Sequence, residues 1–137
     1  MYQLYFLSII INLIVGIVLA RSLIAGKFPT LGNLLETIGE ANLFRFAGGI
    51  AAATVGVLKI LLVTVNDVLI VGDLVPALAG IIAGAILLFE CFREKAVDFP
   101  RWVDRIADFL VAGKSVWGLI AVAAAALHFF FYQALLL

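Results

Sequence analysis

The chain has 137 residues, of which 66% are hydrophobic and only 13% are charged, and its basic and acidic residues balance to zero net charge. An ordinary soluble domain is about 45–50% apolar and about 25% charged, and a domain of this length could not hide so much apolar surface from water. The composition therefore excludes a water-soluble fold and predicts an integral membrane protein. Zero net charge also argues against a nucleic-acid partner.

Long apolar runs predict where the chain crosses the bilayer. A membrane-spanning helix needs about 20 mostly apolar residues, and runs of this kind cover approximately residues 3–22, 46–66, 71–91 and 116–137. Each run is nearly free of charge. We therefore expect an all-α membrane protein with four transmembrane helices in a single domain, residues 1–137.

Basic residues determine the expected orientation. Eight of the nine lie in or beside two long connections, residues 22–45 and 92–115. Because cytoplasmic loops carry the excess of Lys and Arg, we expect both connections on the cytoplasmic side of a bacterial inner membrane. Both termini and the short turn at residues 66–73 then face outward. The eight basic residues are Arg21, Lys27, Arg45, Arg93, Lys95, Arg101, Arg105 and Lys114.

A Phe-Pro pair, at residues 28–29 and 99–100, opens an amphipathic segment in each long connection. Apolar residues recur there at the spacing of one helix face, with polar residues between them. Each segment is too short and too polar to span, and an amphipathic helix of this kind lies in the headgroup plane. The expected interfacial residues are Leu34, Ile38, Trp102 and Ile106.

This order of parts occurs twice, which predicts an internal repeat. Gly49 is followed ten residues later by Lys59, and Gly118 is followed ten residues later by His128. Each unit holds two spans, so the copies would share one orientation about a pseudo-two-fold axis along the membrane normal. The units would cover about residues 1–66 and 71–137. Two unrelated helical hairpins are the alternative, since apolar spans resemble one another by chance.

Small residues predict the helix contacts, because helices in lipid pack closest where Gly, Ala and Ser let backbones approach. Each expected span has one face of small residues at helical spacing, and its bulky residues lie on the opposite face. The glycines expected in these contacts are Gly16, Gly49, Gly56, Gly80, Gly84 and Gly118.

Asn12, Lys59 and His128 are polar residues that lie deep inside the expected spans. All three are about 10–15 Å from the outer helix ends, so they could form one layer. One interpretation is an outward-facing pocket for a small anion, a headgroup or a partner's carboxylate, with Asp73 or Asp67 at its mouth. In the other, Lys59 extends to Asp67 or Asp73 at the outer surface, while Asn12 and His128 make interhelical hydrogen bonds.

Catalytic signatures are missing from the sequence. The chain has one histidine, one cysteine, and no HExxH or GxSxG motif, so it offers neither a metal site nor a nucleophile with a base. We predict no enzyme activity, no cofactor and no metal.

Glu90, near the cytoplasmic end of the third span, is expected to form a solvated ion pair with Arg93 or Lys95.

These features favour a small non-catalytic auxiliary or scaffold subunit that packs within a larger membrane protein complex. The expected helices leave almost no mass outside the bilayer, and their bulky faces are available to lipid, to other subunits or to a second copy. The alternative is a small oligomeric transporter or channel that uses the pocket of Asn12, Lys59 and His128. A further possibility is lipid binding at the amphipathic segments.

Overall fold

The computed structural model describes residues 2–62 and 74–130, except for the side chain of Tyr2, and every regular element in these ranges is an α-helix. The all-helical prediction is therefore confirmed. In chain order the helices are α1 (Tyr2–Leu19), α2 (Arg21–Ala25), α3 (Pro29–Glu40), α4 (Asn42–Leu61), α5 (Leu74–Glu94), α6 (Arg101–Ala112) and α7 (Lys114–Phe130).

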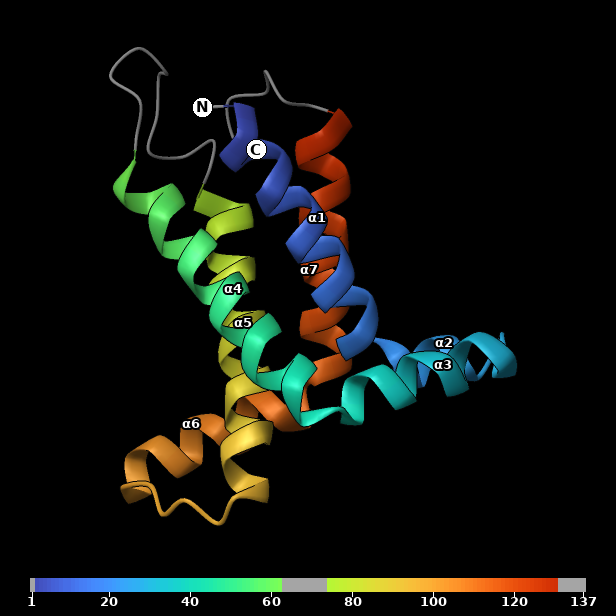
Figure 1. Cartoon of the computed structure of the whole chain (residues 1–137), viewed down its shortest axis with the longest axis vertical. Helices are drawn as coiled ribbons and strands as arrows, with labels where there is room; N and C mark the ends of the chain where they lie inside the picture. The colour runs from blue at the N-terminus through green and yellow to red at the C-terminus, as the bar shows by residue number, and fades with distance from the viewer. Residues whose placement is uncertain (1, 63–73, 131–137) are drawn as a thin grey trace.

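Four long helices, α1, α4, α5 and α7, form an upright bundle (Figure 1). The most extensive contacts join α4 to α5 and α1 to α7, and α5 also packs against α1 and α7. Two of the four, α4 and α5, are each long and apolar enough to cross a membrane. The bent pair of α6 and α7 would make a third span, and α1 holds a shorter apolar helix, Gln3–Leu19. A membrane location is therefore compatible with the fold.

The helix boundaries differ from the expected spans: α4 begins at Asn42 instead of residue 46, α7 begins at Lys114 instead of residue 116, and two further differences follow. The first span divides at Ala20, because α1 ends at Leu19 and the short α2 turns away to pack against α3. A side chain at Gly32 would overlap Ala25, so this contact is close enough to require glycine. At the end of the third span, α5 continues beyond residue 91 to Glu94. The predicted ends at residues 63–66, 71–73 and 131–137 lie outside the described residues.

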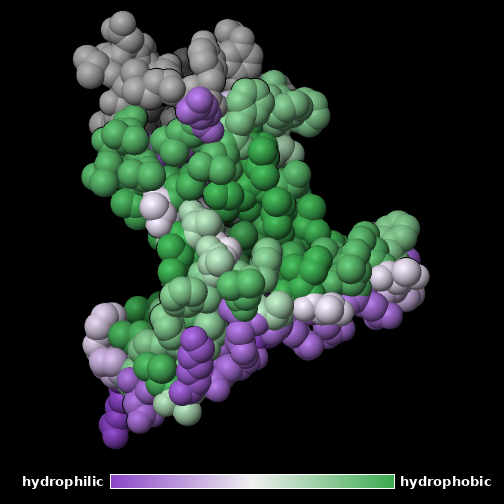
Figure 2. All heavy atoms as spheres, viewed as in Figure 1, coloured by the Kyte–Doolittle hydropathy of each residue, from purple (hydrophilic) through white to green (hydrophobic). Residues whose placement is uncertain are grey.

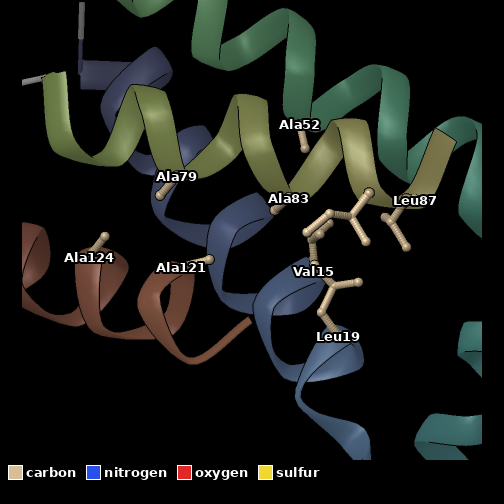
Figure 3. Close-up of a cluster of buried hydrophobic side chains, with 9 residues drawn as sticks. Val15, Leu19, Ala52, Ala79, Ala83, Leu87, Ala121 and Ala124 are labelled. Atoms are coloured by element: carbon tan, nitrogen blue, oxygen red, sulfur yellow. The ribbon is translucent and has the colours of Figure 1, made fainter. Parts of the chain in front are cut away.

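The bundle core is built largely from alanine. Alanines from α4, α5 and α7 lie where these helices approach α1, and larger aliphatic side chains fill the space toward the end of α1 (Figure 3). Small side chains bring the helix axes together and increase van der Waals contact, which drives helix association in lipid. The cluster comprises Val15, Leu19, Ala52, Ala79, Ala83, Ile86, Leu87, Ala121 and Ala124.

Two wings extend from one end of the bundle. The first wing is the α2–α3 hairpin and the second wing is α6, and they point to opposite sides of the bundle (Figure 1). The second wing meets α7 at a 69° bend. Polar residues gather on the side of the wings that faces away from the bundle, and apolar residues on the other side (Figure 2). Helices α3 and α6 of the wings correspond to the two segments that follow the Phe-Pro pairs in the sequence, and α2 precedes the first pair.

Candidate functional site

Two backbone-to-backbone crossings hold the long helices in pairs. On α1 and α7, a Cβ added to Gly16 would lie 2.8 Å from the carbonyl oxygen of Gly118, and one added to Gly118 would lie 2.6 Å from the oxygen of Gly16. On α4 and α5, the corresponding distances between Gly49 and Gly84 are 3.0 and 2.6 Å. No larger residue fits at these crossings unless the helices move apart.

The two crossings are equivalent in sequence register. Gly118 follows Gly49 by 69 residues. Val122 follows Ala53 by the same number, and their backbone nitrogens lie 3.0 and 2.7 Å from a Cβ built on Gly16 and Gly84, respectively. Helix α1 therefore packs against α7 through the same positions at which α5 packs against α4.

The remaining two predicted glycines pack against α5 or lie on it. A Cβ at Gly56 would lie 2.6 Å from the carbonyl oxygen of Ala77, and a Cβ at Gly80 would lie 2.9 Å from Oδ1 of Asn12. The structure thus places all six glycines in close contacts between helices.

Lys59 and His128 meet inside the bundle. They are 4% and 3% exposed, and Lys59 Nζ lies 2.9 Å from His128 Nε2. Tyr5 covers the pair: its hydroxyl donates to the carbonyl of His128 at 2.6 Å, and its ring centroid is 5.8 Å from Lys59 Nζ. We call these three residues the inner cluster. Because a protonated amine and a protonated imidazole have only donors, the pair carries at most one positive charge while this hydrogen bond exists.

Asn12 makes an interhelical hydrogen bond, as the second interpretation expected, and its partner is on α5. Its Nδ2 donates to the carbonyl oxygen of Pro76 on α5 at 2.8 Å, and the residue is buried. A carbonyl oxygen has two lone pairs, so the bond from Asn12 is available in addition to the helix's own. The structure therefore joins Lys59 to His128 and ties Asn12 to α5. Asp67 and Asp73, predicted at the mouth of the pocket, lie outside the described residues.

A second group of charges, here called the charged cluster, lies at the end of the bundle that carries the wings. It consists of Arg45, Glu90, Glu94 and Lys114. Lys114 Nζ donates to Glu90 Oε1 at 2.6 Å, while Glu90 Oε2 lies 4.0 Å from Arg45 Nε and has no hydrogen-bond partner in the part of the chain that the structure describes. Arg45 forms an ion pair with Glu94 and donates from Nε to the carbonyl of Gly39 at 2.6 Å.

The prediction that Glu90 pairs with Arg93 or Lys95 in solvent is wrong. The Glu90 side chain is only 10% exposed and points to the start of α7, where Lys114 meets it. Arg93 lies on another face of α5 and bonds Asp108 of α6 at 2.6 Å. The solvated-pair hypothesis assumed that nearby positions on one helix pair first, but the bend before α7 brings a better partner to Glu90.

Sequence reasoning did not predict that Arg45 and Lys114 share one cluster, although they occupy equivalent positions in the proposed repeat. Arg45 and Lys114 are 69 residues apart, as are Lys59 and His128. Each lies four residues before an equivalent glycine, Gly49 or Gly118, so a longer alignment of the two units would have matched Arg45 with Lys114. Equivalent basic positions of the two proposed units thus come together at both ends of the bundle core.

The chemistry available to these clusters is hydrogen bonding and charge pairing. Within residues 2–62 and 74–130, no three His, Cys, Asp or Glu side chains gather where they could hold a metal ion. The single cysteine, Cys91, is fully buried in α5. The clusters tie the helices together at two levels, with the alanine-rich core between them.

These features describe an all-helical protein whose apolar helices suit a membrane. A family model with no described function matches residues 1–128, and the chain belongs to that family. The match includes both clusters and both wings. No curated protein and no solved structure matches the chain.

Proposed function

We propose that the chain is a non-catalytic auxiliary subunit that sits in the bilayer and packs against other subunits of a membrane protein complex. The observation that carries this proposal is the division of the bundle surface. Charged and small residues are turned inward, where they pair and pack, while the outer faces expose bulky apolar side chains such as Ile10, Leu58, Leu119 and Leu127. A surface of this kind suits lipid and neighbouring helices.

In the proposed arrangement α1, α4, α5 and α7 each cross the membrane. At about 1.5 Å per residue, the 20 residues of α4 extend about 30 Å, which matches the hydrocarbon thickness. The wings lie in the cytoplasmic headgroup plane, and both termini lie outside, in a bacterial inner membrane. Exposed Leu34, Trp102 and Ile106 suit that depth, and Ile38 is half-buried.

We further propose that residues 1–66 and 71–137 form two parallel repeat units. The equivalent glycine crossings and the equivalent basic pairs support this, because a chance likeness of apolar segments would not reproduce the contacts. Under the proposal, a pseudo-two-fold axis runs along the membrane normal between Lys59 and His128.

Purification after gentle solubilisation tests the subunit proposal. Native mass spectrometry should find the chain with a membrane protein in fixed stoichiometry, and a stable lone monomer would contradict the proposal. Tryptophan at exposed Ala47 of α4 or Ala123 of α7 then locates the contact face. The substitution on the contact face should release the partner, and the other should leave it bound.

The alternative function is a small oligomeric transporter or channel, and the buried Lys59–His128 contact is the observation that favours it. Intramembrane ionisable groups often belong to substrate or ion pathways. In proteoliposomes, Lys59→Met and His128→Ala should then abolish flux while each variant keeps its helical content. Wild-type flux in both variants would exclude the pocket of Asn12, Lys59 and His128.

A further inference from the structure

We propose that the wings make the protein prefer curved membrane, with the wings in the leaflet on the convex side. The proposal rests on the membrane embedding proposed above and adds a function to it, which is recognition of membrane shape. The ligand is a lipid surface, and the recognition elements are α3 and α6.

The wings place extra volume at one level of the molecule. Both leave the same end of the bundle and point in opposite directions (Figure 1). Each has a 12-residue helix, α3 or α6, that is about 18 Å long and about 10 Å wide and covers roughly 180 Å², and α2 adds to the first wing. Within the described ranges, the other end of the bundle carries only the ends of the upright helices.

The exposed apolar faces of the wings identify the acyl region of a leaflet as their environment. Trp102 and Phe109 on the second wing are 67% and 69% exposed, and Leu34 on the first wing is 57% exposed. Glu36 lies on the opposite face of α3 and Arg105 lies at the polar edge of the apolar face of α6. The apolar faces continue onto the apolar surface of the bundle (Figure 2). A leaflet surrounds the bundle, so it covers both wings at once.

The wings are fastened to the bundle. Arg45 of α4 donates to the carbonyl of Gly39 in the first wing at 2.6 Å, and Arg21 of the first wing donates from Nη1 to the carbonyl of Val18 in α1 at 3.1 Å. Arg93 of α5 bonds Asp108 of the second wing at 2.6 Å, and Ala107 of the second wing is fully buried. The spans therefore fix the depth of both wings, which cannot leave the leaflet without breaking these contacts.

A fixed pair of wedges in one leaflet has a physical consequence. Together the wings occupy about 360 Å² of that leaflet near the headgroup boundary, while the described part of the opposite end adds only the bundle itself. On a convex surface the headgroups are spread, so the wedges fit at lower cost than on a flat one. Small vesicles should therefore hold the molecule with its wings in the outer leaflet.

The test measures insertion direction in vesicles of two sizes. Full-length Asn33→Cys protein is reconstituted into small and large vesicles of phosphatidylcholine and phosphatidylglycerol, and an impermeant thiol reagent counts the wings that face outward. Asn33 is exposed on α3, whereas Cys91 is buried. The ratio of outward to inward molecules should rise on the order of twofold or more from large to small vesicles. Leu34→Gln with Trp102→Gln should remove the rise, and Glu36→Gln with Arg105→Gln should keep it.

The outcomes separate this inference from the embedding on which it rests. An equal ratio in both vesicle sizes, with protein that resists alkaline carbonate extraction, overturns the curvature preference and leaves the embedding intact. Loss of the rise in the Glu36 and Arg105 control also overturns it, because the apolar faces are then not the cause. Extraction of the wild-type protein by carbonate overturns the embedding and the inference together.

Discussion

Gly84 and Gly48 show how local the requirement for glycine is. A Cβ at Gly84 would lie 2.6 Å from the backbone oxygen of Gly49 and 2.7 Å from the backbone nitrogen of Ala53. At Gly48, by contrast, the nearest atom is the end of the Leu87 side chain at 3.6 Å, which is ordinary contact. Backbone atoms cannot yield separately, so a methyl group at Gly84 must push α4 and α5 apart.

We therefore expect Gly84→Ala to lower the free energy of unfolding by about 1–3 kcal/mol. Gly48→Ala should change it by less than about 1 kcal/mol, with the better helix propensity of alanine offsetting the added methyl group. Reversible unfolding in mixed micelles, followed by circular dichroism, measures both. Equal effects of the two substitutions would show that the crossing is not as close as described.

Glu90 and Glu94 differ in how much water reaches them. Glu90 is 10% exposed and bonds Lys114, while Glu94 is 47% exposed and pairs with Arg45. A buried carboxylate that faces two basic residues leaves them without compensation when its charge is removed. Water instead screens the charge of the half-exposed Glu94 in its pair with the buried Arg45, so that pair is worth less.

Glu90→Gln, which keeps the shape, should cost about 1–3 kcal/mol of unfolding free energy, and Glu94→Gln less than about 1 kcal/mol. The same micelle titration compares the two variants. A larger loss for Glu94→Gln would place the main charge contact at the surface and not at Glu90.

At the scale of the helices, the connection between α2 and α7 is a contact that hydropathy did not suggest. The Oγ atoms of Ser22 and Ser115 lie 2.7 Å apart and share a hydrogen bond. The contact joins the start of the first wing to the start of α7, and the break at Ala20 makes it possible. A continuous first span would carry Ser22 along the axis of α1.

A double cysteine variant tests this geometry. Ser22→Cys with Ser115→Cys should form a disulfide under mild oxidation, which increases gel mobility until a reductant is added, because the side chains are already in contact. Asn33→Cys with Ser115→Cys serves as the control and should stay reduced, since Asn33 lies on the exposed face of α3. Cross-linking of the control alone would contradict the position of α2.

The sequence predicted the helix class, the cores of the long helices and their small-residue faces, because these depend on composition and periodicity alone. It did not predict the break at Ala20, since a hydropathy window averages over the close packing of Gly32 on Ala25. For the site, the inward faces of Lys59 and His128 followed from helical spacing. Their direct contact, and the partner of Glu90, depend on how the helices are rotated and bent against one another.

At the scale of the whole molecule, two polar clusters enclose an alanine-rich core, and two wings spread from one end. The equivalent crossings of α1 on α7 and α5 on α4 make the bundle interlocked, because each proposed unit finds its closest partners in the other. This arrangement suits a compact membrane subunit whose outer faces remain free for lipid and for neighbouring chains.

The central claim is that the wings lie on one side of a membrane that the bundle crosses. A cysteine introduced at Gln3, Asn33 or Arg105, all exposed positions, can be probed in intact cells with an impermeant thiol reagent, because the native Cys91 is buried. We expect the cysteine at residue 3 to react from outside, and those at residues 33 and 105 to react only after permeabilisation. Reaction of residues 33 and 105 from opposite sides would contradict two spans between them, and with them the parallel repeat.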